Sequence, residues 1–293
     1  MTEYGGVPMS PTRPNLFIVG APKCGTTAMA EYLGAHPDIF MSRPKEPLYF
    51  LHENDKQRKI IHEDHYLSIF TSARGCAVVG EASVWYLYSR HARERIKAFS
   101  PGARIIIMTR HPYGFVPSLH AQMVFSGREE ENLSEAWRRE RERLGIAELP
   151  TIEYAENWRR MYPVLMQHDH FIAEYKNTFG AENVLVLRQE DMVKDVATTY
   201  RRALAFLGVP DDGREQFEVI NASKGHRNEF VRRLLHWTSR QQWLIDSLRA
   251  VKRRLGIGSF GAYALVARLN LRRQTRPALP TAVRRDIDRL SQT

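Results

Sequence analysis

Short apolar runs separated by helical patterns recur along most of the chain. Four runs predict buried strands: Leu16–Gly20, 76–80, Arg104–Thr109 and 184–187. The third, RIIIMT, is the strongest because β-branched residues favour extended backbone. Hydrophobic residues at helical spacing predict helices over 25–33, 91–99, Leu133–Leu144, 154–167 and Val196–Leu207. This alternation predicts an α/β fold in three layers, with a central parallel sheet flanked by helices.

The pattern changes after about residue 221, where strand signals disappear and arginines become frequent. Residues 227–255 predict a basic helix with Phe230, Leu234 and Trp237 on one side. The tail after Arg272 contains two prolines and is expected to fray. These boundaries predict a flexible N-terminus over 1–14, one domain over 15–227 and a basic helical extension over 228–293 that packs on that domain.

Charge is distributed unevenly along the 293 residues, whose net charge is +10. From Lys224 onward there are 16 Lys and Arg residues and 4 acidic residues, a net charge of +12, whereas the preceding part carries −2. This excess indicates either an anionic partner or a solvated basic helix face. The anion could be a nucleotide phosphate, an acidic acceptor, nucleic acid or a membrane surface, and Phe260–Leu271 with its flanking arginines predicts peripheral membrane contact.

Cysteine usage and the N-terminus predict a cytoplasmic protein. Cys24 and Cys76 are far apart and form no CxxC pair, so neither a disulfide framework nor a zinc site is predicted. The first residues contain no apolar run typical of a secretory signal. No stretch of about 18 apolar residues predicts a transmembrane helix.

A phosphate-binding loop is predicted where the first strand meets the first helix. The sequence GAPKCGTT offers backbone N–H groups at a helix start, a close approach at Gly25, and a mobile positive charge on Lys23. Thr26 and Thr27 add hydroxyl donors. The loop differs from a Walker A motif, because Lys23 precedes the glycine instead of following it.

The segment PKCGTT resembles the 5′-phosphosulfate loop of sulfotransferases that use 3′-phosphoadenosine 5′-phosphosulfate (PAPS). The resemblance implies a P-loop-like fold, PAPS as sulfuryl donor, 3′-phosphoadenosine 5′-phosphate (PAP) as product, and no metal. It also implies that Lys23 contacts the oxygen that bridges sulfate and nucleotide. The loop residues assigned to PAPS are Pro22, Lys23, Cys24, Gly25, Thr26 and Thr27.

A second nucleotide contact is predicted at the end of the strongest strand. Arg110 follows this strand, and Ser118 lies eight residues later on a helix that Pro112 can begin. Both resemble the 3′-phosphate site of the same family, where a bidentate arginine grips the phosphate. The basic segment SKGHR adds Lys224 and Arg227 as further phosphate contacts. The resemblance covers residues 15 to 227, which defines a PAPS-dependent sulfotransferase domain.

The catalytic base is predicted from the segment RPKEPLYF, which resembles the KEP element of heparan-sulfate-type sulfotransferases. The match implies that Glu46 is the base and that Lys45 tunes it or binds the acceptor. Glu81, after the second strand, is the alternative carboxylate. Histidines serve as bases in many small-molecule sulfotransferases, and His91, His111 and His120 are the histidines available for that role.

The acceptor is left open by the sequence. Glu81, Trp85 and Tyr86 are candidates for an acceptor pocket. Heparan-sulfate-type relatives commonly have a lysine where this chain has Ala82, which favours another acceptor. A small molecule, glycan or lipid would fit, through a hydroxyl or an amine, and the oligomeric state is not predicted. An ATP-dependent P-loop phosphotransferase or an inactive nucleotide-binding module are the alternative functions, and nucleic acid is not expected.

Overall fold

The centre of the molecule is a five-stranded parallel sheet. The computed structural model describes residues 12–58, 60–73, 75–144, 157–220, 224–226, 271–273 and 278–291. In spatial order the strands are β2 (Ile39–Met41), β3 (Val78–Ala82), β1 (Leu16–Gly20), β4 (Arg104–Thr109) and β5 (Val184–Arg188). All four neighbouring pairs are parallel. The predicted α/β class with a parallel central sheet is confirmed.

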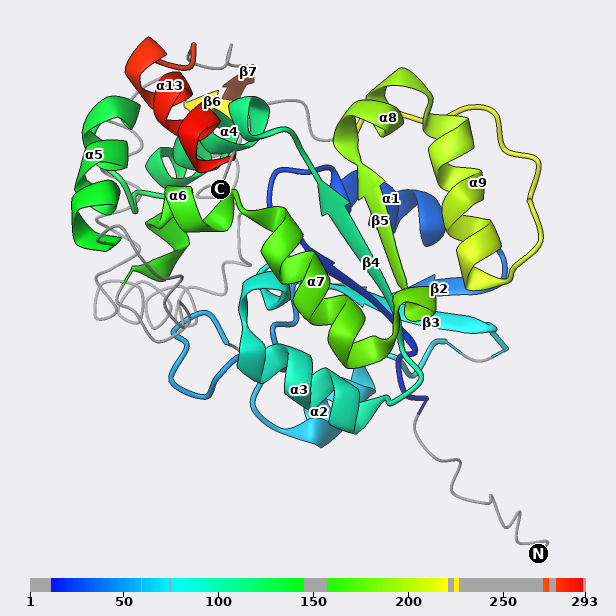
Figure 1. The fold of residues 1–293 in the computed structure, drawn as a ribbon. Helices are drawn as coiled ribbons and strands as arrows, with labels where there is room; N and C mark the ends of the chain where they lie inside the picture. The colour runs from blue at the N-terminus through cyan, green and yellow to red at the C-terminus, as the bar shows by residue number, and fades with distance from the viewer. Residues whose placement is uncertain are drawn as a thin grey trace, which may run out of the picture.

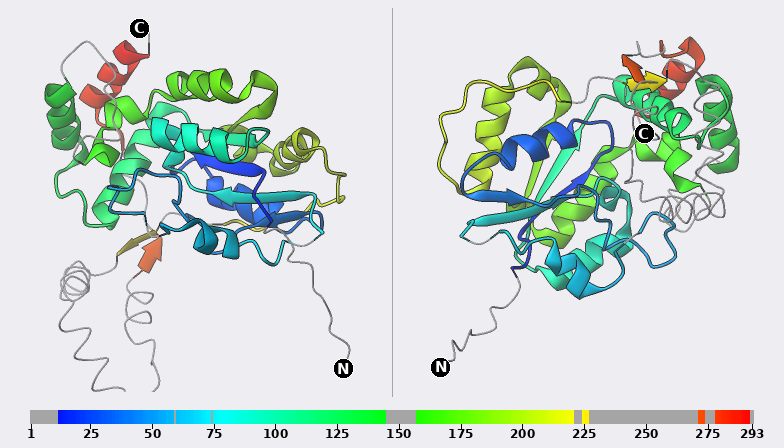
Figure 2. Two further views of the ribbon diagram at one scale, coloured as in Figure 1. Left: turned by 90° about the horizontal axis from the view of Figure 1, so that it is seen from below. Right: turned by 180° about the vertical axis from the view of Figure 1, so that it is seen from behind.

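Helices cover both faces of this sheet (Figures 1 and 2). One face carries α1 (Thr26–Leu33) and α9 (Val196–Leu207), and the other carries α3 (Arg90–Phe99) and α7 (His168–Phe179). Every residue of β1 is buried, as expected for a strand covered on both sides. The smaller elements are α2 (Glu63–Ser68), α8 (Gln189–Lys194) and the 3₁₀ turns Tyr86–Tyr88, Trp158–Arg160 and Ala181–Asn183.

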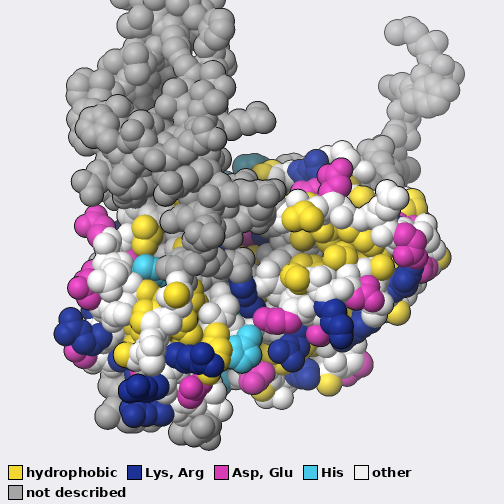
Figure 3. All heavy atoms as spheres, turned by 90° about the horizontal axis from the view of Figure 1, so that it is seen from above, with side chains coloured by type: hydrophobic (Ala, Val, Ile, Leu, Met, Phe, Trp, Pro, Cys, Tyr) yellow, Lys and Arg dark blue, Asp and Glu magenta, His cyan; other side chains and the backbone are white. Residues whose placement is uncertain are grey.

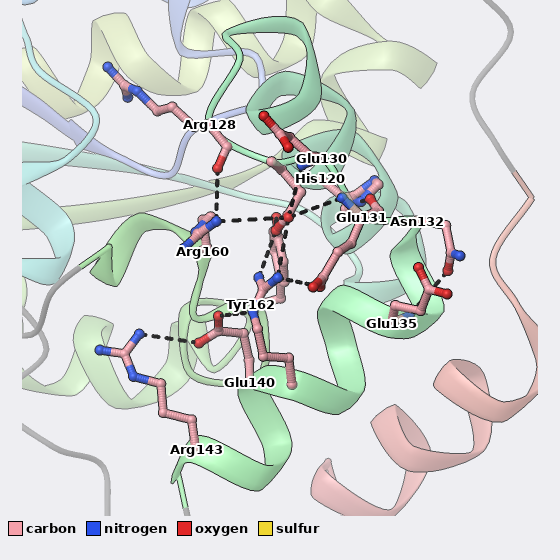
Figure 4. Close-up of polar contacts among 12 residues, drawn as sticks. His120, Arg128, Glu130, Glu131, Asn132, Glu135, Glu140, Arg143, Arg160 and Tyr162 are labelled. Atoms are coloured by element: carbon pink, nitrogen blue, oxygen red, sulfur yellow. Dashed lines mark hydrogen bonds and ion pairs between the residues drawn. The ribbon is translucent and has the colours of Figure 1, made fainter.

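A second group of helices lies beside the sheet: α4 (Pro112–Phe125), α5 (Leu133–Leu144), α6 (Tyr162–Leu165) and α13 (Thr281–Leu290) (Figure 1). A polar network joins α4, α5 and the segment before α6 (Figure 4). The buried carboxylate of Glu129 accepts hydrogen bonds from Arg139 Nη2 at 2.8 Å and from Tyr162 OH at 3.1 Å. Arg139 also binds Glu131 and Glu140. The network fixes α5 to the rest of the domain.

Replacing Glu129 by glutamine is expected to lower the free energy of unfolding by about 1.5–3 kcal/mol, the value of a charge-assisted hydrogen bond. Burial acts to raise the pKa of Glu129, but Arg139 outweighs it and the pKa lies below the ordinary 4.5. The stabilisation is therefore complete above pH 4.5 and is lost as the pH falls through the lowered pKa. Urea titrations of Glu129→Gln and of the exposed control Glu142→Gln test this, and equal stabilities would contradict it.

Four sequence predictions differ from the structure. Strand β3 begins at Val78, two residues after the predicted start, because pairing with β2 begins there. The predicted helix 154–167 is interrupted, within its described part, between Trp158–Arg160 and α6, which restarts at Tyr162 with Pro163 in its first turn. The tail does not fray throughout, because α13 buries Val283 and Ile287. The predicted absence of strands in the basic region is wrong at Lys224–His226 and Leu271–Arg273, which pair antiparallel.

The remainder of the predicted basic extension lies outside the described residues, including the predicted helix over 227–255 and all of the predicted membrane-contacting segment Phe260–Leu271 except Leu271. Among the residues that the structure describes, no helix is long and apolar enough to cross a bilayer. On the face seen from above, described Lys and Arg side chains lie singly or in small groups between acidic ones (Figure 3).

Candidate active site

The predicted phosphate loop joins β1 to α1 at the carboxyl edge of the sheet. Gly25 caps α1 in the left-handed conformation, with φ of 91°. This conformation is strained for any residue with a Cβ, and an added Cβ would also lie 2.5 Å from Met192 Cε of α8, so the position favours glycine. Pro22, Cys24 and Thr26 are buried, Thr27 is half-buried, and Lys23 is exposed. The loop therefore presents Lys23 and the start of α1 together, as an anion site requires.

The side chains of Lys23 and Arg110 both contact helix α4. Lys23 Nζ donates to Gln122 Oε1 on α4 at 3.2 Å. The Arg110 guanidinium lies against Gly114 in the first turn of α4, where an added Cβ would be 2.4 Å from Arg110 Nε. Ser118 is one turn further along the same helix and is 4% exposed. The two residues predicted for a second phosphate are thus placed along one face of α4.

The buried thiol of Cys24 lies close enough to Lys23 and Arg110 for both positive charges to act on it. Burial raises its pKa strongly, while the positive charges of Arg110 and Lys23 oppose that shift and Glu190 adds to it. Cys24 is thus a packed, protonated thiol in this loop, and its side chain bonds the carbonyl oxygen of Pro22 at 3.5 Å. The loop lysine and the strand-end arginine both act on this one buried atom, although they are 87 positions apart in sequence.

Glu46 lies on the loop that follows β2, at the same edge of the sheet. Its Oε2 accepts a hydrogen bond from the backbone N–H of Val84 at 3.1 Å, and its Oε1 pairs with Lys45. The side chain is 31% exposed, so it remains accessible to a substrate. The Val84 carbonyl oxygen lies beside Gly20, where an added Cβ would be 2.9 Å away. One residue, Val84, thus lies between the Glu46 carboxylate and the start of the predicted phosphate loop.

Glu81 and Tyr86 lie in the interior, with 0% exposure each. The Glu81 carboxylate accepts hydrogen bonds from Tyr66 OH and Ser83 Oγ, both at 2.7 Å, and from Tyr86 OH at 3.2 Å. Burial raises the pKa of Glu81 to about 7, although the three hydroxyl groups oppose the shift. The expectation that Glu81 and Tyr86 contact an acceptor does not fit this burial, since every carboxylate partner is supplied by the protein.

Lys45 pairs with Glu46, and Trp85 directly follows Val84, whose N–H binds the Glu46 carboxylate. Trp85 is 8% exposed and packs against Trp158, with ring centroids 5.3 Å apart. The guanidinium of Arg159 lies 5.1 Å from the Trp85 ring and binds Asp55 at 2.8 Å. Glu46 also acts electrostatically on Arg159. The position of Arg159 near Trp85 could not be predicted from the sequence, because its partner Asp55 is 104 residues away and the pair forms no motif.

All three candidate histidine bases contact other groups of the protein. His120 is buried, and its Nε2 lies 3.0 Å from the carbonyl oxygen of Glu131. His111 caps α4, where its Nδ1 accepts from Tyr113 N–H at 3.3 Å. The third, His91, packs against His52 with ring centroids 5.0 Å apart. Glu46 stays the candidate base of the sequence analysis, with a carboxylate that is 31% exposed on the loop after β2.

Two predicted phosphate contacts cannot be placed at this site. Lys224 belongs to the strand Lys224–His226, whose side chains are not described, and Arg227 lies outside the described residues. Within the described ranges, no three His, Cys, Asp or Glu side chains are grouped to hold a metal ion.

Comparison with known proteins identifies the family. A family model described as "Sulfotransferase family" matches residues 14–89 and 87–213. Carbohydrate sulfotransferase 15 of Homo sapiens is 23% identical over 297 residues, covering 83% of this chain. Heparan sulfate glucosamine 3-O-sulfotransferase 6 of Homo sapiens is 26% identical over 227 residues, covering 72% of this chain. The chain spans about half the length of these relatives, with 52% and 57% of them aligned.

A solved structure shares the fold over most of both chains. The sulfotransferase from Alicyclobacillus acidocaldarius superposes with a TM-score of 0.59 and 28% sequence identity. The match covers 86% of this chain and 99% of that chain.

Proposed function

This chain belongs to the sulfotransferase family, whose sulfuryl donor is PAPS, and we propose that it transfers a sulfuryl group from PAPS to a hydroxyl group of a saccharide. The observation that supports this most is the arrangement at the sheet edge. Loops after β1, β2 and β4 bring Lys23, Glu46 and Arg110 to the end where parallel α/β sheets bind ligands.

The proposed reaction is a direct in-line transfer. Glu46 takes the proton from the acceptor hydroxyl as the acceptor oxygen forms a bond to sulfur. The bond between sulfur and the bridging oxygen breaks, and Lys23 stabilises the negative charge that develops on this leaving oxygen. Arg110 and Ser118 hold the 3′-phosphate, and PAP leaves with both phosphates. The chemistry involves only the donor, the acceptor and these side chains.

The names of two relatives support a saccharide acceptor, because they are a carbohydrate sulfotransferase and a heparan sulfate sulfotransferase. Lys45, which pairs with Glu46 and is partly exposed, offers a cation to such an acceptor. Transfer of label from PAPS to heparan sulfate and to an uncharged oligosaccharide would test this. Labelling of neither saccharide would contradict the acceptor class but not the donor site.

The donor site is tested by calorimetric titration with PAP and with ADP, both without magnesium. We expect PAP to bind much more tightly, because only PAP carries the 3′-phosphate that Arg110 would grip. Equal affinities would contradict the site, and ADP binding that needs magnesium would favour a P-loop phosphotransferase. Tight PAP binding without transfer to any acceptor would favour an inactive binding module.

Replacing Gly114 by alanine is expected to weaken PAP binding about tenfold without destabilising the fold. The new Cβ would meet the Arg110 guanidinium at 2.4 Å and displace it from its place on α4. Alanine is favoured over glycine within a helix by about 1 kcal/mol, so the melting temperature should stay equal or rise. Calorimetry with PAP, together with thermal unfolding, measures both effects. Unchanged PAP affinity would show that the position of the Arg110 guanidinium beside Gly114 does not matter for nucleotide binding.

A further inference from the structure

We propose that Glu81 is a positioning residue that holds the loop carrying Glu46 in its active shape. This inference rests on the proposed function, which makes Glu46 the base. Glu81 is a fully buried carboxylate at the carboxyl end of β3, and the reaction itself makes no use of it. A buried carboxylate is costly unless it is fully hydrogen-bonded, so its presence within a sheet strand needs a reason.

Two hydrogen-bonded chains run from Glu81 to the Glu46 loop. The N–H of Leu48 donates to Ser83 Oγ at 3.2 Å, and Ser83 Oγ donates to Glu81 Oε2 at 2.7 Å. In parallel, the N–H of Phe50 donates to Tyr86 OH at 3.2 Å, and Tyr86 OH donates to Glu81 Oε1 at 3.2 Å. Each hydroxyl hydrogen is directed at Glu81, which leaves the oxygen lone pairs free to accept from the loop.

The loop needs this support because its backbone is strained. Glu46 and Leu48 both have left-handed conformations, with φ of 64° and 55°. Such conformations are uncommon for residues with a Cβ and persist where the surroundings impose them. Together with the hydrogen bond from Glu46 N–H to the Ala82 carbonyl at 3.1 Å, the two chains from Glu81 constrain the loop at three points.

The same network sets the direction of the Glu46 carboxylate. Val84 N–H, which binds Glu46 Oε2, follows Ser83 directly in the chain. Ser83 is fixed by its side chain to Glu81 and by its backbone N–H to the Ile18 carbonyl at 3.1 Å. Glu81 therefore acts on both the loop and the peptide that orients the base. Its contribution is to the geometry of Glu46, without contact with substrate.

The first test needs no substrate. Hydrogen–deuterium exchange of the segment 46–51 is measured by mass spectrometry in the wild type and in Glu81→Gln, with 104–109 as the internal reference. The amide NH2 of the glutamine replaces one of the two accepting oxygens with a donor, so the hydroxyl on that side, Ser83 or Tyr86, can no longer donate to residue 81. We therefore expect exchange in 46–51 to accelerate at least about tenfold while 104–109 is unchanged. Unchanged exchange in 46–51 would overturn the proposal.

Single-hydroxyl variants keep the test decisive if Glu81→Gln fails to fold. Ser83→Ala and Tyr86→Phe each remove one chain to the loop and should accelerate exchange in 46–51. Tyr66→Phe is the matched control, because Tyr66 OH also donates to Glu81 but neither chain to the loop passes through it. Equal exchange in all three variants would contradict the proposed route.

The second test separates positioning from general destabilisation. With heparan sulfate as the acceptor, Glu81→Gln should lower kcat by about 10- to 100-fold, as expected for a misplaced catalytic group, and leave KM for PAPS unchanged. In the Glu46→Gln background the same change should cost nothing further, because Glu81 acts through Glu46. An equal loss in both backgrounds would overturn the proposal. If the wild type does not sulfate heparan sulfate, that acceptor fails and the exchange experiment still decides the role of Glu81.

Discussion

Replacing Glu46 by glutamine is expected to lower the rate of sulfuryl transfer by about 10²–10⁴-fold, the contribution of a general base. Glutamine has nearly the same shape and can still accept the hydrogen bond from Val84 N–H, so the loop should keep its path. It cannot take the proton from the acceptor. Affinity for PAP should change less than about twofold, because the nucleotide is held by other loops. Single-turnover transfer from labelled PAPS, with calorimetry for PAP, measures both quantities.

Glu53→Gln is the matched control for this change. Glu53 is seven residues further along the same segment, is exposed, and should be replaceable with no effect on either quantity. Full turnover by Glu46→Gln would exclude Glu46 as an essential base. A parallel loss of PAP affinity would instead indicate that the Glu46 loop contributes to the nucleotide site.

Replacing Arg110 by alanine is expected to weaken PAP binding by about 1.5–3 kcal/mol, the value of a hydrogen bond to a charged group. This corresponds to roughly a 10- to 150-fold rise in Kd. ADP lacks a 3′-phosphate, so its weaker binding should be unaffected, and the preference for PAP over ADP should largely disappear. Parallel titrations of both nucleotides measure the two affinities.

Arg104→Ala is the control for the loss of an arginine from the same strand. Arg104 begins β4, at the edge of the sheet opposite to Arg110, and its guanidinium lies 5.6 Å from the Phe206 ring. Arg104→Ala should change the free energy of unfolding slightly and should leave the preference for PAP over ADP unchanged. An equal drop in PAP and ADP affinity in Arg110→Ala would place Arg110 at the shared 5′-phosphate, contrary to the proposal.

Local signals in the sequence were sufficient for the central elements. The β-branched run of β4 and the amphipathic helices α5 and α9 were predicted with the bounds that the structure has. These elements form where sequence periodicity and burial agree. The start of β3 was misplaced because pairing with β2 defines it, and pairing is not visible in a single strand.

The sequence by itself was sufficient to predict the α/β class, the strand-to-helix loop that carries Lys23 and the position of Arg110 at a strand end, because each is signalled by residues that are neighbours in the chain. Only the tertiary structure decided where the Glu81 carboxylate lies and what it contacts. Its sequence position suggested a contact with the acceptor, but three hydroxyl groups from Tyr66, Ser83 and Tyr86 surround it in the interior. Likewise, only the fold brings Lys23 Nζ within 3.2 Å of Gln122 Oε1 on α4. Such contacts depend on how separate helices, strands and loops pack together, and the local sequence pattern of each element does not specify that packing.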